Sequence, residues 1–201
     1  LVLLVETNSM KQIKLPKHSF MVGAYIDLKL CDDLIEHHKT FRHRAYNGTV
    51  GDSTTAFVDT KIKQSLDLHI NKSPLLFEQY NKELDKVLCL YEKKYKYVKN
   101  LKAFNNIQEN TNIQYYTLGG GFKNWHCERN GFSTSKRQFV FMTYLNDVPK
   151  GGTEFYYFPE LNLQAKKGLT LIWPSDWTHT HKGVVSKTHE KYIVTGWFNF
   201  Y

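Results

Sequence analysis

Two side chains of the kind that bind metal ions stand close together in the second half of the chain. His126 and Glu128 are two positions apart, so on an extended chain both emerge on the same face and can reach one ion. A third ligand must come from a distant segment, and the residues alone leave three candidates: His179, His181 and His189. Two imidazoles and one carboxylate on one face suit iron(II) with open coordination positions. The sequence therefore predicts a metal site.

Lys191 adds a cation to this part of the chain. It stands at the head of the apolar run 191–198, where an ammonium group could form a charge-assisted pair with an anionic co-substrate. Cys127 lies between the two proposed ligands, and on a strand its side chain would point to the opposite face. We therefore interpret Cys127 as a buried packing residue.

The chain from residue 113 onward has the pattern of antiparallel β-structure. Short runs rich in β-branched and aromatic residues are separated by turn signals such as Gly119-Gly120-Gly121, Gly151-Gly152 and Pro174. No helical pattern interrupts them, which indicates sheets closed as a sandwich or a jelly roll. The predicted strands are residues 113–117, 137–145, 154–158, 161–165, 169–173 and 191–198.

The first half of the chain carries the predicted helices. Apolar residues recur at helical spacing over residues 27–39 and 74–98, and the second run begins with Ser73 as a capping hydroxyl and Pro74 in the first turn. Residues 65–70 alternate apolar and polar side chains, which predicts a half-buried strand. The apolar stripe of the longer helix must be buried, so we expect it to lie against a sheet.

Length and cysteine content bound the class of protein. The 201 residues suit a single domain over residues 1–201, with helical support at about 27–100 and a β core at about 111–201. The opening run Leu1 to Val5 is too short to span a membrane, and without a basic region or a cleavage site it does not predict a secretory signal. Residues 1–9 are interpreted as an addition before a native start at Met10. The three cysteines fall in unrelated contexts, so we expect a cytoplasmic protein with no membrane partner.

The net charge of +8 would favour an acidic partner, but the charge is spread along the chain. Its densest patch, residues 93–99, interleaves lysines with tyrosines, a combination that can bind nucleic acid. We interpret this patch instead as the solvated side of a helix whose tyrosines pack inward. Nucleic-acid binding is therefore the less favoured interpretation.

Together these motifs resemble those of the iron(II)- and 2-oxoglutarate-dependent dioxygenases of the prolyl 4-hydroxylase type. The likeness is carried by the His-x-Glu pair, a distal His, and a Lys ten residues further on that begins an apolar strand ending in Trp. This register selects His181 and leaves His179 as a neighbour on the same side and His189 as a turn residue. The likeness covers about residues 113–201, where further matching segments are Tyr144-Leu145-Asn146, Gly151-Gly152-Thr153-Glu154-Phe155 and Leu169 to Pro174.

The resemblance implies a fold, a reaction and a set of site residues. The fold would be α+β but mainly β, a double-stranded β-helix (jelly roll) with N-terminal helices packed on the outside of one sheet. Iron(II), 2-oxoglutarate and dioxygen would be required, with ascorbate as a further candidate. The implied catalytic residues are His126, Glu128 and His181 as metal ligands and Lys191 as the cation for 2-oxoglutarate; the other implied contacts are Tyr144, Thr195 and Tyr116 with 2-oxoglutarate, and Trp125 and Trp197 as apolar walls.

Glu128 departs from the family's pattern, which usually has aspartate at this position. The additional methylene moves the carboxylate by about an ångström or more unless the backbone compensates. We therefore expect a change in the way this ligand is held.

Three functions are weighed from the sequence. The favoured one is hydroxylation of a prolyl or other side chain of a protein or peptide, with release of succinate and carbon dioxide. The same chemistry on a small molecule or a nucleic-acid base is an alternative motivated by the basic charge. A further alternative is a non-catalytic jelly-roll module that holds zinc through His126, Glu128, His179 and His181. Residues 41–60, a long loop before the sheet, are expected to select the substrate.

Overall fold

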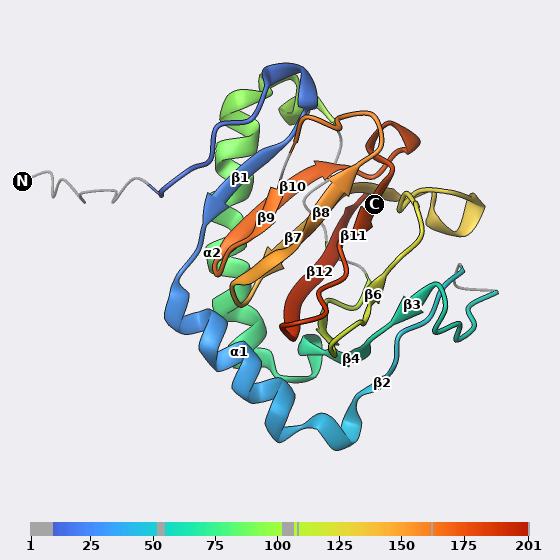
Figure 1. Ribbon diagram of the computed structural model, residues 1–201. Coiled ribbons are helices and arrows are strands. Elements are labelled where there is room, and N and C mark those ends of the chain that lie inside the picture. The colour runs from blue at the N-terminus through green and yellow to red at the C-terminus, as the bar shows by residue number, and fades with distance from the viewer. Residues whose placement is uncertain (1–9, 52–54, 102–106, 108, 162, 201) are drawn as a thin grey trace, which may run out of the picture.

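A seven-stranded antiparallel sheet, here called the major sheet, organises the computed structural model, which describes residues 10–51, 55–101, 107, 109–161 and 163–200 (Figure 1). Its strand order is β1-β10-β7-β12-β5-β4-β2. A three-stranded minor sheet has the order β11-β8-β9, and β3 pairs with β6. The strands are β1 (Val22–Tyr25), β2 (Tyr46–Asn47), β3 (Lys63–Gln64), β4 (Leu66–His69), β5 (Asn112–Tyr116), β6 (Gly121–Phe122), β7 (Arg137–Tyr144), β8 (Val148–Phe155), β9 (Leu163–Ala165), β10 (Leu169–Pro174), β11 (His181–Gly183) and β12 (Lys191–Asn199).

Two α-helices, α1 (Leu28–Thr40) and α2 (Pro74–Lys94), pack on one face of the major sheet. In Figure 1, α2 runs behind β1 and β10, and it contacts both strands. Its buried stripe includes Tyr80, Leu84 and Tyr91, and each such side chain contributes roughly 1.5–3 kcal/mol by leaving water. The 3-10 helices are η1 (Lys17–Ser19), η2 (Arg42–Arg44), η3 (Ile70–Lys72), η4 (Lys96–Asn100), η5 (Phe132–Thr134) and η6 (Trp177–His179).

The strand β12 shows how one sheet serves two faces. It lies between β5 and β7 in the major sheet, and successive side chains of a strand point to opposite sides. Tyr192, Val194 and Phe198 belong to the core under the helices. Lys191 and Thr195 point to the other face and line a cavity. The minor sheet packs on this second face through a separate apolar cluster that contains residues of β7, β8, β9 and β10.

The predicted helices are present, with two corrections at the second one. Its α-helical part ends at Lys94, and the chain continues as the tighter helix η4 rather than as regular helix to residue 98. Ser73 does stand at the N-cap of α2, but its hydroxyl makes no capping bond. The Ser73 hydroxyl oxygen lies 3.0 Å from His37 Nε2 instead, so contact with α1 outweighs local capping.

The predicted strand 154–158 is misplaced, because β8 covers Val148–Phe155. The sequence predicts a turn at Gly151-Gly152, but both residues lie within β8. The register of the pairing with β9 shifts between Val148 and Thr153, and a Cβ on Gly152 would lie 1.6 Å from the Leu163 carbonyl oxygen. The glycines therefore allow a bulge and a close approach of β9 rather than a change of direction.

Among the described residues, neither helix combines the length and the hydropathy that a membrane span requires. Residues 1–9, which were interpreted as an added leader, lie outside the described residues.

Candidate metal centre and co-substrate cavity

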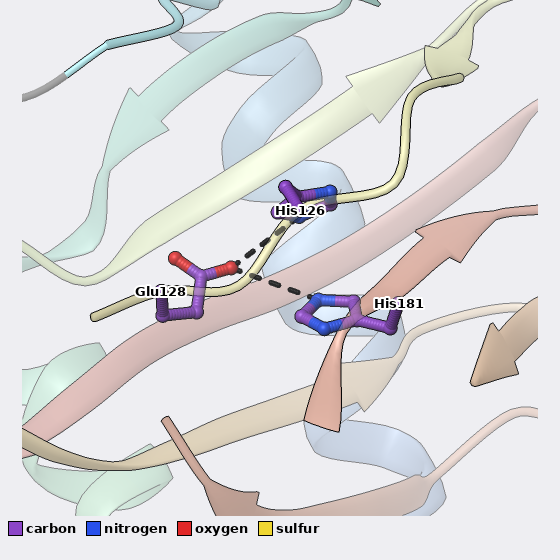
Figure 2. A group of neighbouring side chains, drawn as sticks. All are labelled: His126, Glu128 and His181. Atoms are coloured by element: carbon purple, nitrogen blue, oxygen red, sulfur yellow. Dashed lines mark ion pairs between the residues drawn. The ribbon is translucent and has the colours of Figure 1, made fainter. Parts of the chain in front are cut away.

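His126, Glu128 and His181 converge on one point (Figure 2). Glu128 Oε1 lies 3.4 Å from His126 Nε2 and 3.6 Å from His181 Nε2, and one ligand atom from each residue lies within 4.8 Å of the others. The backbone holds the two imidazoles together, because the N–H of each histidine donates to the carbonyl of the other at 3.0 and 2.8 Å. The structure therefore brings together the three predicted ligands.

The segment with His126 and Glu128, which the sequence predicts to be extended, lies outside the regular strands. His126 forms only an isolated bridge with His181, and Glu128 lies in a bend. The backbone N–H of Glu128 donates to the Ser175 carbonyl at 3.2 Å. The chain is extended enough for both side chains to point the same way, although no strand ladder fixes them.

The rings of both histidines are oriented by backbone carbonyls. His126 Nδ1 lies 3.0 Å from the Asn124 carbonyl oxygen, and His181 Nδ1 lies 2.9 Å from that of His179. A carbonyl only accepts, so each Nδ1 carries a hydrogen and each Nε2 faces Glu128. This arrangement is common around metal-binding histidines.

The electrostatics also prepare the cluster for a cation. Burial alone would raise the pKa of Glu128, but the hydrogen bond and charge of His126, with the charges of His181 and Arg137, outweigh it and lower that pKa to about 2. Burial lowers the pKa of His181 to about 3. At neutral pH the carboxylate is therefore charged and His181 is neutral, as ligands must be.

The second carboxylate oxygen of Glu128 is held from the opposite side. Trp197 Nε1 donates to Glu128 Oε2 at 3.0 Å, and Arg137 Nη1 lies 3.6 Å from the same oxygen. The Arg137 guanidinium also stacks on the Trp197 ring at 3.7 Å and is paired with Glu109. The longer acidic side chain is thus fixed at both oxygens, with Oε1 left facing the histidines.

The sequence did not predict the roles of Arg137 and Glu109. Arg137 was noted only as the start of a predicted strand, and Glu109 has no motif around it. A charged residue at the start of a buried strand was the available signal, because such a charge needs a partner.

The other two histidine candidates lie outside the cluster. His179 is buried with Nε2 2.8 Å from the Ser19 carbonyl oxygen, which ties it to the N-terminal segment. His189 is exposed and contacts Thr188. The choice of His181 from the ten-residue register agrees with this geometry. The set of four zinc ligands that included His179 is not formed.

A cavity of about 230 Å³ adjoins the cluster and lies between the major sheet and the minor sheet. Lys191 is buried in its wall, where Nζ donates to the carbonyls of Gly151 and Val184 at 2.9 Å each. Nζ also lies 5.4 Å from the centroid of the Tyr116 ring. Within the described part of the chain, no carboxylate forms an ion pair with Lys191, and burial lowers its pKa to about 8.

The three hydroxyl residues expected near 2-oxoglutarate all line this cavity. The Tyr144 hydroxyl lies 2.5 Å from Thr153 Oγ1, and Thr195 Oγ1 donates to the Phe141 carbonyl at 3.3 Å. The Tyr116 hydroxyl donates to Gln114 Oε1 at 2.7 Å. Burial raises the pKa of Tyr144 and of Tyr116, so both stay neutral donors.

Two predictions about neighbours of His126 need correction. Trp197 lines the cavity as expected, but Trp125 does not; its ring is 41% exposed and packs against Tyr156. Cys127 is half-buried and lines the cavity instead of filling the core. Because residues 126–128 do not form a strand, the alternation that placed Cys127 on the far face does not apply.

A buried ion pair in the cavity wall was also missed. Asp67 accepts from Lys63 Nζ at 2.8 Å, from Ser65 Oγ at 2.7 Å and from Gln114 Nε2 at 3.1 Å. The alternation over residues 65–70 correctly predicted β4 and placed Asp67 on its polar side. That side faces the cavity rather than solvent, which the pattern alone did not reveal.

The long loop expected to select the substrate contributes to the cavity. Tyr46, Thr49, Val50 and Gly51 line it, and the backbones of Val50 and Phe57 form a bridge. Residues 52–54 of this loop lie outside the described residues.

Comparison with known proteins identifies the class. Residues 111–199 match the model of the 2OG-Fe(II) oxygenase superfamily, and this segment contains the three clustered ligands and Lys191. A search of curated proteins by sequence found no match. Residues 111–199 therefore match a 2OG-Fe(II) oxygenase domain, a class that uses Fe(II), 2-oxoglutarate and dioxygen. The donor set of two imidazoles and one carboxylate fits iron(II).

Solved structures give the particular fold. A Pseudomonas putida prolyl-4-hydroxylase is similar with a TM-score of 0.66 and 14% identity, over 91% of this chain and 94% of that one. A viral collagen prolyl hydroxylase of Paramecium Bursaria Chlorella virus-1, in complex with 2OG, is similar with a TM-score of 0.60 and 15% identity, over 98% of this chain and 99% of that one. A Trichoplax adhaerens prolyl hydroxylase, in complex with a hypoxia inducible factor peptide fragment, is similar with a TM-score of 0.65 and 14% identity, over 90% of this chain and 84% of that one. These structures show the fold of the prolyl 4-hydroxylases, which confirms the predicted jelly roll, and the family match over residues 111–199 supports a 2-oxoglutarate-dependent dioxygenase.

Proposed function

We propose that the protein hydroxylates a C–H bond of a protein or peptide, with a prolyl side chain as the favoured target. One oxygen atom of dioxygen becomes the substrate hydroxyl, and the other enters succinate as 2-oxoglutarate loses carbon dioxide. Three prolyl hydroxylases of similar fold support the choice of a peptide substrate, one of them in complex with a peptide fragment.

The observation that carries the proposal is the buried ammonium group of Lys191, in the same cavity as the His/Glu/His cluster. An ammonium group has three hydrogens, and two of them are used by the carbonyls of Gly151 and Val184. The third N–H and the positive charge of Lys191 can therefore bind an anionic group. The distal carboxylate of 2-oxoglutarate supplies that anion while its 2-oxo acid end reaches the cluster.

Each remaining polar group has a role in the proposal. His126, Glu128 and His181 hold iron(II) on one face, and the iron, when bound, supplies open positions for the 2-oxo acid and dioxygen. The hydroxyls of Tyr144 and Thr195 turn from their present partners to the distal carboxylate, and Tyr116 lines the side nearer the cluster. Trp197 and the loop residues 46–51 exclude water from the reacting groups.

The alternative substrates have less support. In the basic patch at residues 93–99, Lys94 Nζ donates to the carbonyls of Leu15 and Met21, and the Tyr95 hydroxyl donates to the Lys17 carbonyl. Tyr95 therefore packs against the N-terminal segment of the same chain, as the packed interpretation requires, whereas Tyr97 is 77% exposed and does not pack inward. A cytoplasmic location stays a prediction.

Anaerobic titration tests the co-substrate assignment. Addition of iron(II) and then 2-oxoglutarate should produce the weak visible absorption of a chelated 2-oxo acid, and absence of the band from folded protein would refute the assignment. Peptide pools incubated with both co-substrates and air should then gain one oxygen by mass spectrometry, in step with succinate. Oxygen gained only by oligonucleotides or small molecules would replace the peptide substrate.

A further inference from the structure

A second cavity lies apart from the metal centre, where the end of α1 and the start of α2 meet β2 and β4 (Figure 1). This junction cavity has a volume of about 250 Å³, close to the lower end of the range for small-molecule sites, roughly 300–1,000 Å³. Its wall includes Phe41, Arg44, Tyr46, Leu68, Lys72 and Ser73. Tyr46 also lines the co-substrate cavity, so the two cavities are neighbours that share one side chain.

Two cations line the junction cavity without an acidic partner. The Arg44 guanidinium lies over the Phe41 ring, 5.0 Å from its centroid. In the described part of the chain, neither Arg44 nor Lys72 forms an ion pair with a carboxylate. A lysine on the exposed side of α2, Lys82, is by contrast paired with Glu78 at 2.7 Å. The wall of the junction cavity therefore carries positive charge that no neighbouring carboxylate offsets.

The first turn of α2 adds to this positive potential. Ser73 is the N-cap, but its hydroxyl makes no capping bond, and the first turn contains no acidic residue. The positive end of the helix dipole is therefore not offset by a side-chain oxygen. Burial lowers the pKa of His37, whose Nε2 lies 3.0 Å from Ser73 Oγ, and the charge of Arg44 lowers it further. All of these groups favour an anion in the cavity.

The charges and the apolar part of the wall together favour one class of ligand. A phosphate monoester carries a charge of about −1.5 to −2 near neutral pH, which matches two cations better than a single carboxylate does. The Arg44 guanidinium can bind two phosphate oxygens, and Lys72 adds a point charge. Phe41 and the buried Leu68 give apolar surface for the organic part of the ester. An inorganic ion would leave that surface in water.

We propose that the junction cavity binds a small phosphate monoester, with the phosphate group between Arg44 and Lys72 and the organic part against Phe41 and Leu68. The site is distinct from the metal centre, because the His/Glu/His cluster and Lys191 line the other cavity. The inference does not depend on the proposed function and holds for any substrate that the protein hydroxylates.

Isothermal titration calorimetry with phenyl phosphate, on the metal-free full chain in about 0.15 M salt, tests the site. Arg44→Met and Lys72→Met should each weaken binding by about tenfold, because each removes a charge-assisted contact. Their melting temperatures should not change, since both side chains are exposed. Lys39→Met is the matched control: it removes an exposed charge of α1 that does not line the cavity, and should change the affinity by less than about twofold. Equal affinity in the two cavity variants and the unmodified protein would overturn the proposal.

Three further ligands test the chemical class. Inorganic phosphate should bind about tenfold more weakly than phenyl phosphate, because it lacks the apolar ring. Benzoate should also bind about tenfold more weakly, because it carries a single charge. Affinity equal to that of phenyl phosphate for either ligand would overturn the assignment to a phosphate monoester. Tighter binding of a deoxythymidine decamer, lost in Arg44→Met and Lys72→Met, would assign the two cations to a nucleic-acid backbone and also overturn it.

Lys191→Met separates the junction cavity from the co-substrate cavity. This variant should bind phenyl phosphate as tightly as the unmodified protein, since Lys191 lines the other cavity. Loss of binding in Lys191→Met together with unchanged binding in Arg44→Met would place the ligand in the co-substrate cavity and overturn the proposal.

Discussion

The two faces of the major sheet are built from the same strands but have opposite chemistry. On the helix face, β12 contributes Tyr192 and Val194 to a core of apolar side chains from α1 and α2. On the cavity face, the same strand contributes Lys191 and Thr195 to a wall that also holds charged and hydroxyl groups. Alternation along a strand separates the two sets by one residue.

This difference indicates that the helix face mainly stabilises the fold, whereas the cavity face mainly provides groups for binding. Shortening a side chain on the helix face lowers the free energy of unfolding, because buried apolar area and close packing are lost together. The cavity face instead contains a buried cation without a carboxylate partner in the described part of the chain, and such a group costs folding free energy. Variants on the two faces should therefore change different measurements.

The largest effect is expected from His126→Ala on the cavity face. Loss of one of three ligands should lower turnover by about 1,000-fold or more, measured as succinate released per minute. Cobalt(II) affinity, followed by visible absorption, should fall in parallel. His189→Ala, which removes an exposed imidazole, is the matched control and should match the unmodified protein; an equal loss in both would contradict the assigned ligands.

Lys191→Met should weaken 2-oxoglutarate binding by about 100-fold, because a charge-assisted hydrogen bond is removed. The melting temperature should rise or stay constant, since a buried charge is replaced by an apolar side chain of similar length. Titration of the visible band with 2-oxoglutarate measures the affinity, and a thermal melt measures the melting temperature. Lys187→Met, at an exposed position, should change neither the 2-oxoglutarate affinity nor the melting temperature. A large loss of stability in Lys191→Met would contradict the proposal that the cavity face contributes to binding rather than to stability.

Leu84→Ala on the helix face should show the converse. Leu84 is buried in α2, and its truncation should lower the free energy of unfolding by about 2–5 kcal/mol. Below the melting transition, 2-oxoglutarate affinity should remain unchanged. Leu75→Ala in the same helix removes an exposed leucine and should shift the unfolding free energy by less than about 0.5 kcal/mol, as urea titration would show.

The sequence predicted the helix face better than the cavity face. Periodicity alone located α1 and α2, because apolar spacing directly reflects burial against one surface. The cluster of His126, Glu128 and His181 and the buried Lys191 were predicted from their spacing and the family resemblance. The placement of Arg137 was missed because its partner Glu109 comes from another segment. The burial of Asp67 was missed because it depends on the pairing of β4 with β5, which brings Gln114 to it. The same limitation misplaced β8, whose Gly151-Gly152 depends on the approach of β9.

Trp197→Phe tests how the longer carboxylate is held and should have a smaller effect. The change removes the Nε1 hydrogen bond to Glu128 Oε2 but keeps an aromatic ring for Arg137. Cobalt(II) affinity should fall by about tenfold, as for other groups that orient a ligand. Trp177→Phe should leave metal affinity unchanged. If Glu128→Asp restores affinity in the Trp197→Phe background, the hydrogen bond serves to position the longer side chain; equal affinity of Trp197→Phe and the unmodified protein would contradict this role.

The smallest effect is a pH dependence of co-substrate binding through Lys191. Its pKa is lowered to about 8 by burial, so the ammonium charge that binds 2-oxoglutarate is lost as the pH rises through that value. Raising the pH from 7 to 8.5 should weaken 2-oxoglutarate binding by about fourfold, the ratio expected for one group that must be protonated.

The stability of the free protein should change in the opposite direction: the unfolded lysine binds a proton up to its ordinary pKa of 10.5, so folding is favoured as the pH rises from about 8 toward that value. Lys191→Met should abolish both dependences, measured by 2-oxoglutarate titration and by urea unfolding at each pH. If the affinity fell equally in Lys191→Met, another group would be responsible.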